Sequence, residues 1–161
     1  MSADAHSPGT FLSPADLLTH WQGHRRLTRR TIEAFPDDAL FRHRVEPMRT
    51  FGEIAGELLA MAAPMVRGLA TGQWDEYAAQ DLTSKAEVLE AWDRSTAEID
   101  ELWPRIPSER FAETLTAFGQ YTDLARNLML YVVDNEIHHR GQGYAYLRGL
   151  GIEPPPFWER D

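Results

Sequence analysis

The sequence predicts an all-α protein, a four-helix bundle with long connections between some of its helices. Two observations lead to this prediction. Four segments of about 20 residues carry apolar residues at i, i+3 and i+4 spacing, which places those residues on one face of a helix. Each segment also begins and ends at residues that favour helix termini. Four amphipathic helices of this length bury their apolar faces against one another in a bundle.

The first helix is expected to begin at Ser13 and to end near Glu33. Pro14 favours this start, because the first helical position leaves its N–H unpaired and proline has none. Asp16 in the first turn suits the positive end of the helix dipole. Pro36 ends the helix, since the residue before a proline is disfavoured in helical conformation.

The second helix is expected to run from Thr50 to about Leu69. Glu53 follows Thr50 by three residues, which is the spacing of a capping box. The stretch after Leu69 reads Ala-Thr-Gly and favours termination at the glycine. More than ten residues separate this helix from each neighbour, so short hairpin connections are not expected.

The third and fourth helices complete the bundle. Ser84 and Glu87 form a second capping-box pattern, and the third helix stops before Pro104. The fourth helix is expected to run from near Thr122 to about Arg148, where glycines and then three consecutive prolines forbid continuation.

The remaining segments carry weaker signals. Residues 1–12 are expected to be flexible, and residues 13–161 to form one domain. Residues 39–46 and 111–119 contain short runs of Phe, Leu, Val and Thr, which favour a small strand pair. The aromatic residues after the terminal prolines are expected to pack on the bundle or on a partner subunit.

Composition and charge exclude several classes of function. Lys and Arg total 16 against 25 Asp and Glu, which gives a net charge of −9. Such an acidic chain binds nucleic-acid phosphates and anionic lipids poorly, so neither nucleic acid nor membrane is expected as a partner. The absence of cysteine excludes disulfides, thiolate metal sites and a cysteine nucleophile. No apolar run approaches the roughly 20 residues that span a bilayer, and the polar start is no secretory signal, which favours a cytoplasmic bacterial protein.

Polar side chains occur on faces that should be apolar. Asn135, His139 and Gln142 share the apolar stripe of the fourth helix, and His24 lies in the stripe of the first. Glu57 flanks the stripe of the second helix. Burying an unpartnered polar group costs about 1–3 kcal/mol, so these residues form either a hydrogen-bonded network or a site.

Two imidazoles and a carboxylate are a recurrent ligand set for catalytic zinc and for non-haem iron. His24, Glu57 and His139 come from three helices and are predicted to converge as metal ligands. The amide oxygen of Asn135 would join or support them. The alternative is that each histidine is a buried side chain hydrogen-bonded to a neighbour. His20 lies one turn before His24 and is expected at the rim of the same face.

Four arginines in the first helix form a basic run: Arg25, Arg26, Arg29 and Arg30. By helical spacing they lie opposite the apolar stripe, so the favoured interpretation is a solvated face paired with nearby acids. The alternative is a local anion site for a partner or a substrate carboxylate.

Residues 134–142 read Asp-Asn-Glu-Ile-His-His-Arg-Gly-Gln, followed by Tyr-Leu-Arg at 146–148 and Gly-Ile-Glu-Pro-Pro at 151–155. This segment resembles the last helix of the DinB/YfiT family, which reads His, three residues, His-Arg-Gly-Gln, then Leu-Arg and Gly-x-x-Pro-Pro. The resemblance implies a four-helix bundle, a homodimer and a divalent metal held by three histidines. Some members of that family are thiol S-transferases that use low-molecular-weight thiols.

The sequence departs from the family pattern at two of the three ligand positions. Glu57 stands where the second helix of the family carries a histidine, and Asn135 stands at the first histidine of the last helix. His139 is retained. Glu57 can still ligate a metal, with His24 supplying an imidazole. The alternative is a site that has lost its metal and kept a hydrogen-bonded cluster.

Two functional hypotheses follow. The first is a metal-dependent enzyme of the thiol S-transferase or hydrolase type, in which Zn, Ni, Mn or Fe lowers the pKa of a bound thiol or water. Gln142 and His138 would then support the metal-bound group, and Arg140 would receive an anionic group of the substrate. The second is a non-catalytic bundle that binds a ligand or dimerises, as a stress-related protein with a structural polar centre. A small-molecule thiol and a second copy of the chain are the expected partners.

Overall fold

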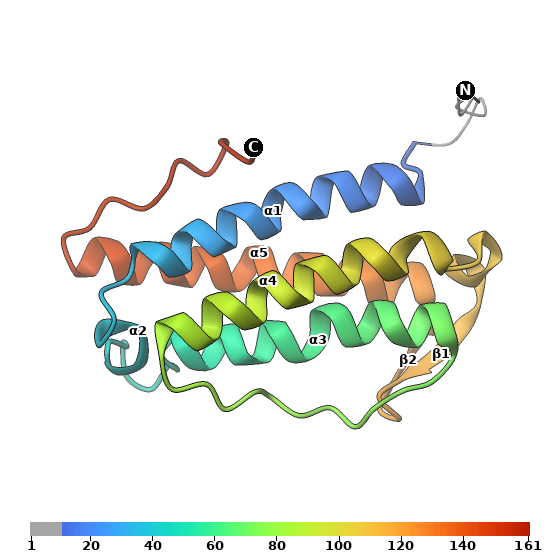
Figure 1. Cartoon of the computed structure of the whole chain (residues 1–161), viewed down its shortest axis with the longest axis horizontal. Helices are drawn as coiled ribbons and strands as arrows, with labels where there is room; N and C mark the ends of the chain where they lie inside the picture. The colour runs from blue at the N-terminus through green and yellow to red at the C-terminus, as the bar shows by residue number, and fades with distance from the viewer. Residues whose placement is uncertain (1–10) are drawn as a thin grey trace.

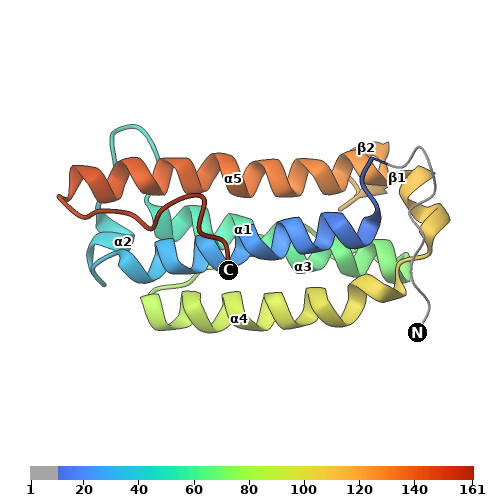
Figure 2. The ribbon, with the colours of Figure 1, turned by 90° about the horizontal axis from the view of Figure 1, so that it is seen from above.

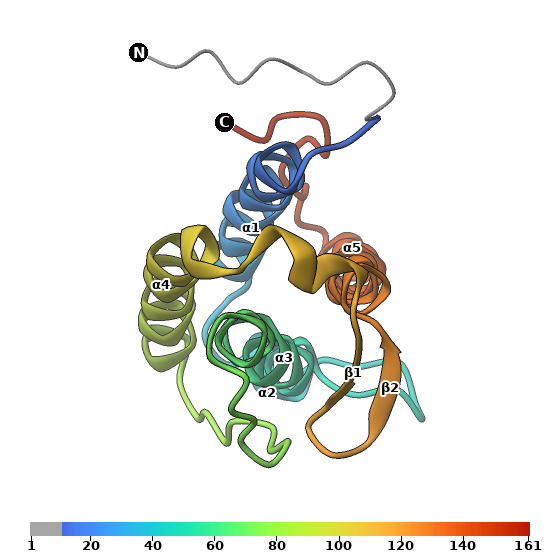
Figure 3. The same ribbon diagram turned by 90° about the vertical axis from the view of Figure 1, so that its right-hand side faces the viewer.

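The computed structural model describes residues 11–161, and its four long helices lie side by side (Figure 1). The predicted flexible segment 1–12 therefore lies almost entirely outside the described residues. Seen from one end, α1 lies diagonally across from α3, and α4 across from α5 (Figure 3). The prediction of an all-α four-helix bundle is confirmed. The helices are α1 (Pro14–Ala34), α3 (Phe51–Thr71), α4 (Lys85–Leu102) and α5 (Ala125–Gly149).

Three predicted helix starts are confirmed, and each is fixed by hydrogen bonds that run both ways between the cap and the third helical residue. Asp16 N donates to Ser13 Oγ at 3.1 Å, while Ser13 N donates to Asp16 Oδ2 at 3.0 Å. The same capping box opens α3 at Thr50 and α4 at Ser84. These caps satisfy N–H groups that the first turn of a helix leaves without partners.

The connection between α3 and α4 sets the topology. Residues 72–84 run back along the length of the bundle, so that α3 and α4 point the same way (Figure 1). This connection touches α3 at Gly56, whose carbonyl oxygen accepts from Gln80 N at 3.4 Å. A Cβ at position 56 would lie 2.5 Å from the Gln80 carbonyl oxygen, so only glycine permits this approach.

The strand pair forms, but not between the predicted segments. Residues 39–46 do not pair as a strand, because α2 (Ala39–Arg42) forms there and buries Leu40. Strand β1 (Thr114–Ala117) lies within the predicted segment 111–119 and pairs antiparallel with β2 (Tyr121–Leu124). A local hairpin closes over far fewer residues than the predicted pairing, which lowers its entropic cost.

The β-hairpin also shifts the start of α5. Because residues 121–124 pair with β1, the helix begins at Ala125 rather than near Thr122. The hairpin turn places Phe118 and Gly119 at φ 53° and 66°. Positive φ at both central residues is what the right-handed twist of two adjacent strands requires of a tight turn. Two short 3₁₀ helices, η1 (Trp103–Arg105) and η2 (Ser108–Ala112), lead from α4 into β1.

The apolar core consists of two clusters. One lies at the hairpin end and includes Trp21 and Val133, and the other includes Ile32 and Tyr146. Between these positions α1 and α5 carry buried polar side chains, so a polar layer separates the two clusters. Helix α3 is long and apolar enough to cross a membrane, but 67% of its most apolar window is buried inside the bundle, as expected of a core helix.

The chain after α5 folds back over α1 (Figure 2). Arg26 Nε donates to the carbonyl oxygen of Arg160 at 3.0 Å, and Arg30 donates to the carbonyl oxygen of Glu159. The aromatic residues Phe157 and Trp158 stay 66% and 67% exposed. The expected packing of this segment on the bundle therefore occurs through its backbone and Arg160 rather than through its aromatic rings.

Candidate functional site

The structure brings three of the four predicted ligands together between α3 and α5. Glu57 Oε1 lies 3.3 Å from His139 Nε2, and Asn135 Nδ2 donates to the same oxygen at 3.4 Å. Asn135 and His139 are one turn apart on α5 and so face Glu57 on α3 from the same side. The fourth predicted ligand, His24, contacts a different set of residues.

A hydrogen-bonded amide orients the imidazole of His139. His139 Nδ1 lies 3.1 Å from Gln142 Oε1, and Gln142 Nε2 lies 3.2 Å from His138 Nε2. With the amide oxygen as acceptor, His139 carries a proton on Nδ1 and directs Nε2 at Glu57. Nε2 is then the nitrogen of His139 that can accept a proton, and a proton placed there would lie against the Glu57 carboxylate.

Glu57 is held as a carboxylate by its neighbours. Burial alone would raise the pKa of Glu57, but the hydrogen bond and charge of Arg49, followed by Asn135 and His139, outweigh burial and lower it. The Arg49 guanidinium pairs with Oε2, which leaves Oε1 directed at His139. Glu57 is therefore ionised at neutral pH and accepts hydrogen bonds from Arg49 and Asn135.

A two-part groove opens at this pair. The larger part, of about 570 Å³, is the aromatic compartment and is lined by Glu57, Met61, Met65, Tyr77, Phe118, Gln120, Tyr121, Thr122, Asp123, Asn127, Leu128 and Tyr131. The smaller part, of about 450 Å³, is the polar compartment and is lined by Glu57, Tyr131, Asp134, Asn135, His138 and His139. Both parts share Glu57 and Tyr131, so Glu57 stands where the two compartments meet, with His139 beside it in the polar compartment.

The predicted metal set does not assemble as such. Within residues 11–161 no group of three or more His, Asp or Glu side chains is arranged to hold a metal ion. Glu57 and His139 supply two donors, whereas Asn135 faces Glu57 with its amide nitrogen, which is not a metal ligand. Arg49 already supplies a positive charge to Glu57. These residues do not fit the three-ligand centre that catalytic zinc or iron uses.

His24 lies in the interior, between two guanidinium groups. Its Nδ1 is 2.9 Å from Arg140 Nη2, and its Nε2 is 3.0 Å from Arg160 Nη1 and 3.2 Å from His20 Nε2. Burial, then Arg140, His20 and Arg160 together lower the pKa of His24 to about 3. The imidazole is therefore neutral and accepts a hydrogen bond from Arg140.

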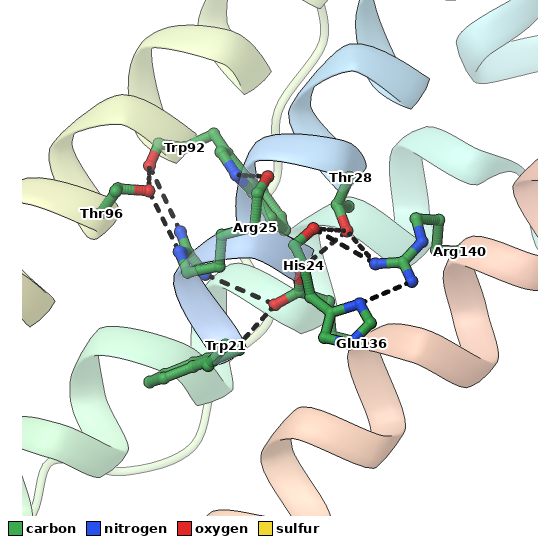
Figure 4. A network of polar contacts seen from close by, with 8 residues as sticks. All are labelled: Trp21, His24, Arg25, Thr28, Trp92, Thr96, Glu136 and Arg140. Atoms are coloured by element: carbon green, nitrogen blue, oxygen red, sulfur yellow. Dashed lines mark hydrogen bonds and ion pairs between the residues drawn. The ribbon is translucent and has the colours of Figure 1, made fainter. Parts of the chain in front are cut away.

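Arg140, which is predicted to receive an anionic group of the substrate, instead lies in the bundle interior beside His24. It is 5% exposed, and its Nη1 donates to the His24 carbonyl oxygen and to Thr28 Oγ1, both at 3.2 Å. Thr28 Oγ1 in turn donates to Glu136 Oε1 at 2.7 Å (Figure 4). Arg140 thus belongs to a buried network centred on Glu136.

The basic run of α1 is only partly a solvated face. Arg25 is 1% exposed, and its guanidinium lies 4.4 Å from the ring centre of Trp92 and 5.6 Å from that of Trp21 (Figure 4). Its Nη1 is 3.7 Å from Glu136 Oε2. The expected solvated position is therefore wrong for Arg25, because the bundle interior holds a carboxylate that can take it in. Arg29 does pair with an acid, Asp93, at 2.6 Å.

The neutral state of His24 leads to a prediction about pH. An unfolded chain binds a proton at His24 below about pH 6.5, whereas the folded protein does so only near pH 3. Between these values the unfolded state holds more protons, so stability falls as the pH falls. Replacing His24 by Gln should flatten this dependence by at most about 1.4 kcal/mol per pH unit, the limit for one proton. Urea unfolding of both proteins from about pH 7 to about pH 4 measures the slopes. Equal slopes of unfolding free energy against pH in the two proteins would contradict the conclusion that folded His24 is neutral.

The chain is similar to proteins of one family in sequence and in fold. The sequence model of the DinB family matches residues 1–161. A DinB-like protein of Bacillus cereus superposes with a TM-score of 0.70 at 15% identity, covering 91% of this chain and 99% of that one. A DinB-like protein of Bacillus subtilis gives 0.70 at 17% identity, covering 90% and 99%. No curated protein sequence gives a significant match.

A third solved structure carries a name that describes an activity. It is a mutant of a mycothiol-dependent maleylpyruvate isomerase, with a TM-score of 0.64 at 13% identity. The alignment covers 82% of this chain but only 61% of that protein. At these identities the three structures establish a shared fold.

Proposed function

Because the chain belongs to the DinB family, we propose that it acts on a small organic molecule in the groove between α3 and α5. The observation that carries this proposal is the Glu57–His139 pair, whose facing atoms lie 3.3 Å apart where the two compartments of the groove meet. Pairs of titratable groups in a cavity are the usual centres of proton transfer in enzymes. The structural neighbour named as an isomerase is consistent with a family of small-molecule enzymes.

The proposed role of the pair is general acid–base catalysis. His139 Nε2 takes the proton from an S–H or O–H group of a molecule in the polar compartment, and the Glu57 carboxylate stabilises the imidazolium that results. Gln142 keeps the other nitrogen protonated and so fixes which nitrogen reacts. The chain contains no cysteine, so a thiol nucleophile comes from a low-molecular-weight co-substrate. The thiolate then forms a C–S bond at the electrophilic carbon of the acceptor as the bond to its leaving group breaks, and the imidazolium returns its proton to that group. The reaction is an S-transfer, or a hydrolysis if water takes the place of the thiol.

This proposal predicts the effect of one substitution. His139→Gln should lower kcat/KM for a thiol and an electrophilic acceptor by about 10²-fold or more, the usual contribution of a positioned base. His43→Gln is the matched control, because His43 contacts the Tyr146 ring away from the groove. A screen of low-molecular-weight thiols with electrophilic acceptors, followed by kinetics of both variants, measures the effect. Equal turnover in wild type and His139→Gln would exclude His139 as the base.

Metal content separates this proposal from the metal-dependent hypothesis. Zn, Ni, Mn or Fe at the Glu57–His139 pair stays a prediction, and plasma mass spectrometry of untagged wild type beside His139→Gln tests it. Turnover without bound metal would support direct proton transfer by His139. Near-stoichiometric metal that is lost in His139→Gln, together with turnover that a chelator abolishes, would replace it with a metal-bound nucleophile.

The second candidate function is a non-catalytic bundle that binds a ligand or dimerises. The observation that favours it is the ion pair between Arg49 and Glu57, which gives the carboxylate a structural partner. In that case no thiol is consumed in the screen, and His139→Gln changes stability without changing ligand binding. Light scattering coupled to gel filtration measures whether the predicted homodimer forms.

A further inference from the structure

We propose that the aromatic compartment binds an organic cation, namely an amine or quaternary ammonium group of the small molecule. The inference rests on the proposed function, since it names the substrate class of the same groove. It depends on three features of the compartment: its rings, its charge and the way in which the rings are held.

Four aromatic residues from three parts of the chain line the compartment. Tyr77 comes from the connection after α3, Phe118 and Tyr121 from the hairpin, and Tyr131 from α5. The faces of aromatic rings carry negative potential, and several rings around one cavity form the arrangement that recognises ammonium groups. Tyr121 and Tyr131 are 54% and 59% exposed, so a ligand can reach them directly from solvent.

The charge of the lining favours a positive ligand. Its ionisable residues besides tyrosine are Glu57 and Asp123, and no Lys, Arg or His contributes to it. Arg49 pairs with Glu57, whereas no basic side chain of residues 11–161 pairs with Asp123. Burial and then the Glu57 carboxylate raise the pKa of Tyr77, so its phenol stays neutral. The compartment thus presents a carboxylate that a bound cation would neutralise.

Asp123 is fixed in place rather than free to turn away. Its Oδ1 accepts from Leu124 N at 2.7 Å and from Asn127 Nδ2 at 3.0 Å. Both donors occupy the same oxygen, so Oδ2 is left as the acceptor for a ligand. Asp123 lies near the end of β2, just before α5 begins, and its side chain lines the same compartment as the aromatic rings.

The ring of Phe118 is held in the wall at a conformational cost. Its φ of 53° lies in the left-handed region, which is unfavourable for a residue with a side chain. The ring is nonetheless 7% exposed, with edge-on contacts to Trp74 at 5.5 Å and to Tyr77 at 5.9 Å. These contacts hold the hairpin turn against the connection after α3, so the aromatic wall is preformed.

Two other ligand chemistries are disfavoured by the same lining. An anion would meet Asp123 and Glu57 with no cationic side chain in the compartment to receive it. A neutral apolar ligand would use the rings but leave the Asp123 carboxylate without a charged partner. The comparison between a cation and its uncharged isostere is therefore the decisive one.

Choline and 3,3-dimethylbutan-1-ol provide this comparison, because they have the same shape and differ in charge. Titration of the full-length protein followed by NMR, with NaCl matching the ionic strength of choline chloride, measures both affinities. We expect choline to bind at least about 10-fold more tightly than the alcohol, since each of the two exposed rings contributes about 2- to 5-fold and Asp123 adds to this. Tyr131→Leu should weaken choline by about 2- to 5-fold and the alcohol much less.

A charge-removing variant tests the carboxylate. Asp123→Asn retains the oxygen that accepts from Leu124 and Asn127 but loses the charge, and it should weaken choline about 5-fold. Asp38→Asn is the matched control at the opposite end of the bundle, where Asp38 makes no side-chain capping bond (Figure 1). It should leave the affinity unchanged, because solvent screens so distant a charge.

The outcomes distinguish this inference from the proposed function. Equal affinity for choline and the alcohol, or no change in Asp123→Asn, would overturn the organic-cation assignment even if His139-dependent turnover is found. His139→Gln should bind choline as wild type does, because His139 lines only the polar compartment. Choline binding without any His139-dependent turnover would overturn the catalytic proposal and leave this inference standing.

Discussion

Glu136→Gln is expected to lower the free energy of unfolding by about 3–5 kcal/mol, the usual cost of removing one partner of a buried ion pair. Glu136 is 2% exposed and accepts from Trp21 Nε1 at 3.0 Å and from Thr28 Oγ1 at 2.7 Å. It also provides the negative charge nearest to Arg25, and it acts on Arg140 as well. Gln has nearly the same shape, so the loss comes from depriving two buried guanidinium groups, Arg25 and Arg140, of the carboxylate that acts on them most strongly.

Urea unfolding at neutral pH measures this loss. Glu153→Gln is the control, because Glu153 is 85% exposed and its contact with Arg148 is 3.5 Å long. A surface change of this kind should alter stability by less than about 0.5 kcal/mol. If Glu136→Gln lost no more than Glu153→Gln, the contact between Glu136 and Arg25 would contribute nothing to stability, and the network would require a different account.

Trp92→Ala is the second large change, with an expected loss of about 3–5 kcal/mol. Trp92 is fully buried, and its ring lies 4.4 Å from the Arg25 guanidinium. Its Nε1 also donates to the Arg25 carbonyl oxygen at 3.2 Å. Alanine would leave a cavity and remove the ring that covers a buried cation, so the loss should fall at the upper end of this range.

Trp158→Ala makes the same chemical change on the exposed C-terminal segment. Trp158 is 67% exposed and contacts Phe157, so its loss should stay within about 0.5 kcal/mol. Thermal unfolding and urea unfolding of both variants provide the comparison. Similar losses in the two proteins would mean that Trp158 has a buried partner that the isolated chain does not show, such as a second subunit.

The helix boundaries were predictable because helix caps are local. Ser13, Thr50 and Ser84 each form the expected hydrogen bonds with a residue three positions later. The sequence carries no such local signal for α2, where Leu40 is helical because it fills the core. The sequence likewise carries no local signal for β2, because residues 122–124 fit the start of the fourth helix equally well. The predicted strand pair is therefore misplaced.

Part of the site was predictable, but its division into two groups was not. The apolar pattern of α5 predicts a stripe through Asn135 and His139. The buried face includes His139 but also takes in Glu136 and Arg140, each one residue further on. Polar residues occupy both stripes, so hydrophobic periodicity alone could not separate the face toward α3 from the face toward α1. His24 was therefore grouped with Glu57, although it meets Arg140 instead.

Arg49 was missed for a different reason. It precedes the cap of α3 and lies on no helix face, so no spacing rule connects it to Glu57 eight residues later. The aromatic compartment was also missed, because Tyr77 and Phe118 come from connections between helices. Contacts between residues of two such connections depend on the path that each connection takes along the bundle, and the spacing of residues in the sequence does not specify that path.

The buried polar layer has a consequence for how the helices align along their axes. Apolar clusters hold helices together without direction, so a helix could slide past its neighbour and still bury its leucines. A slip of α5 by one turn, about 5.4 Å, would instead carry Glu136 away from Thr28 and Arg25, which would break the hydrogen bond to Thr28 and remove the carboxylate nearest to Arg25. The contacts of this layer form in only one axial alignment of α1, α4 and α5. On α5, that alignment also sets the height at which Asn135 and His139 meet Glu57.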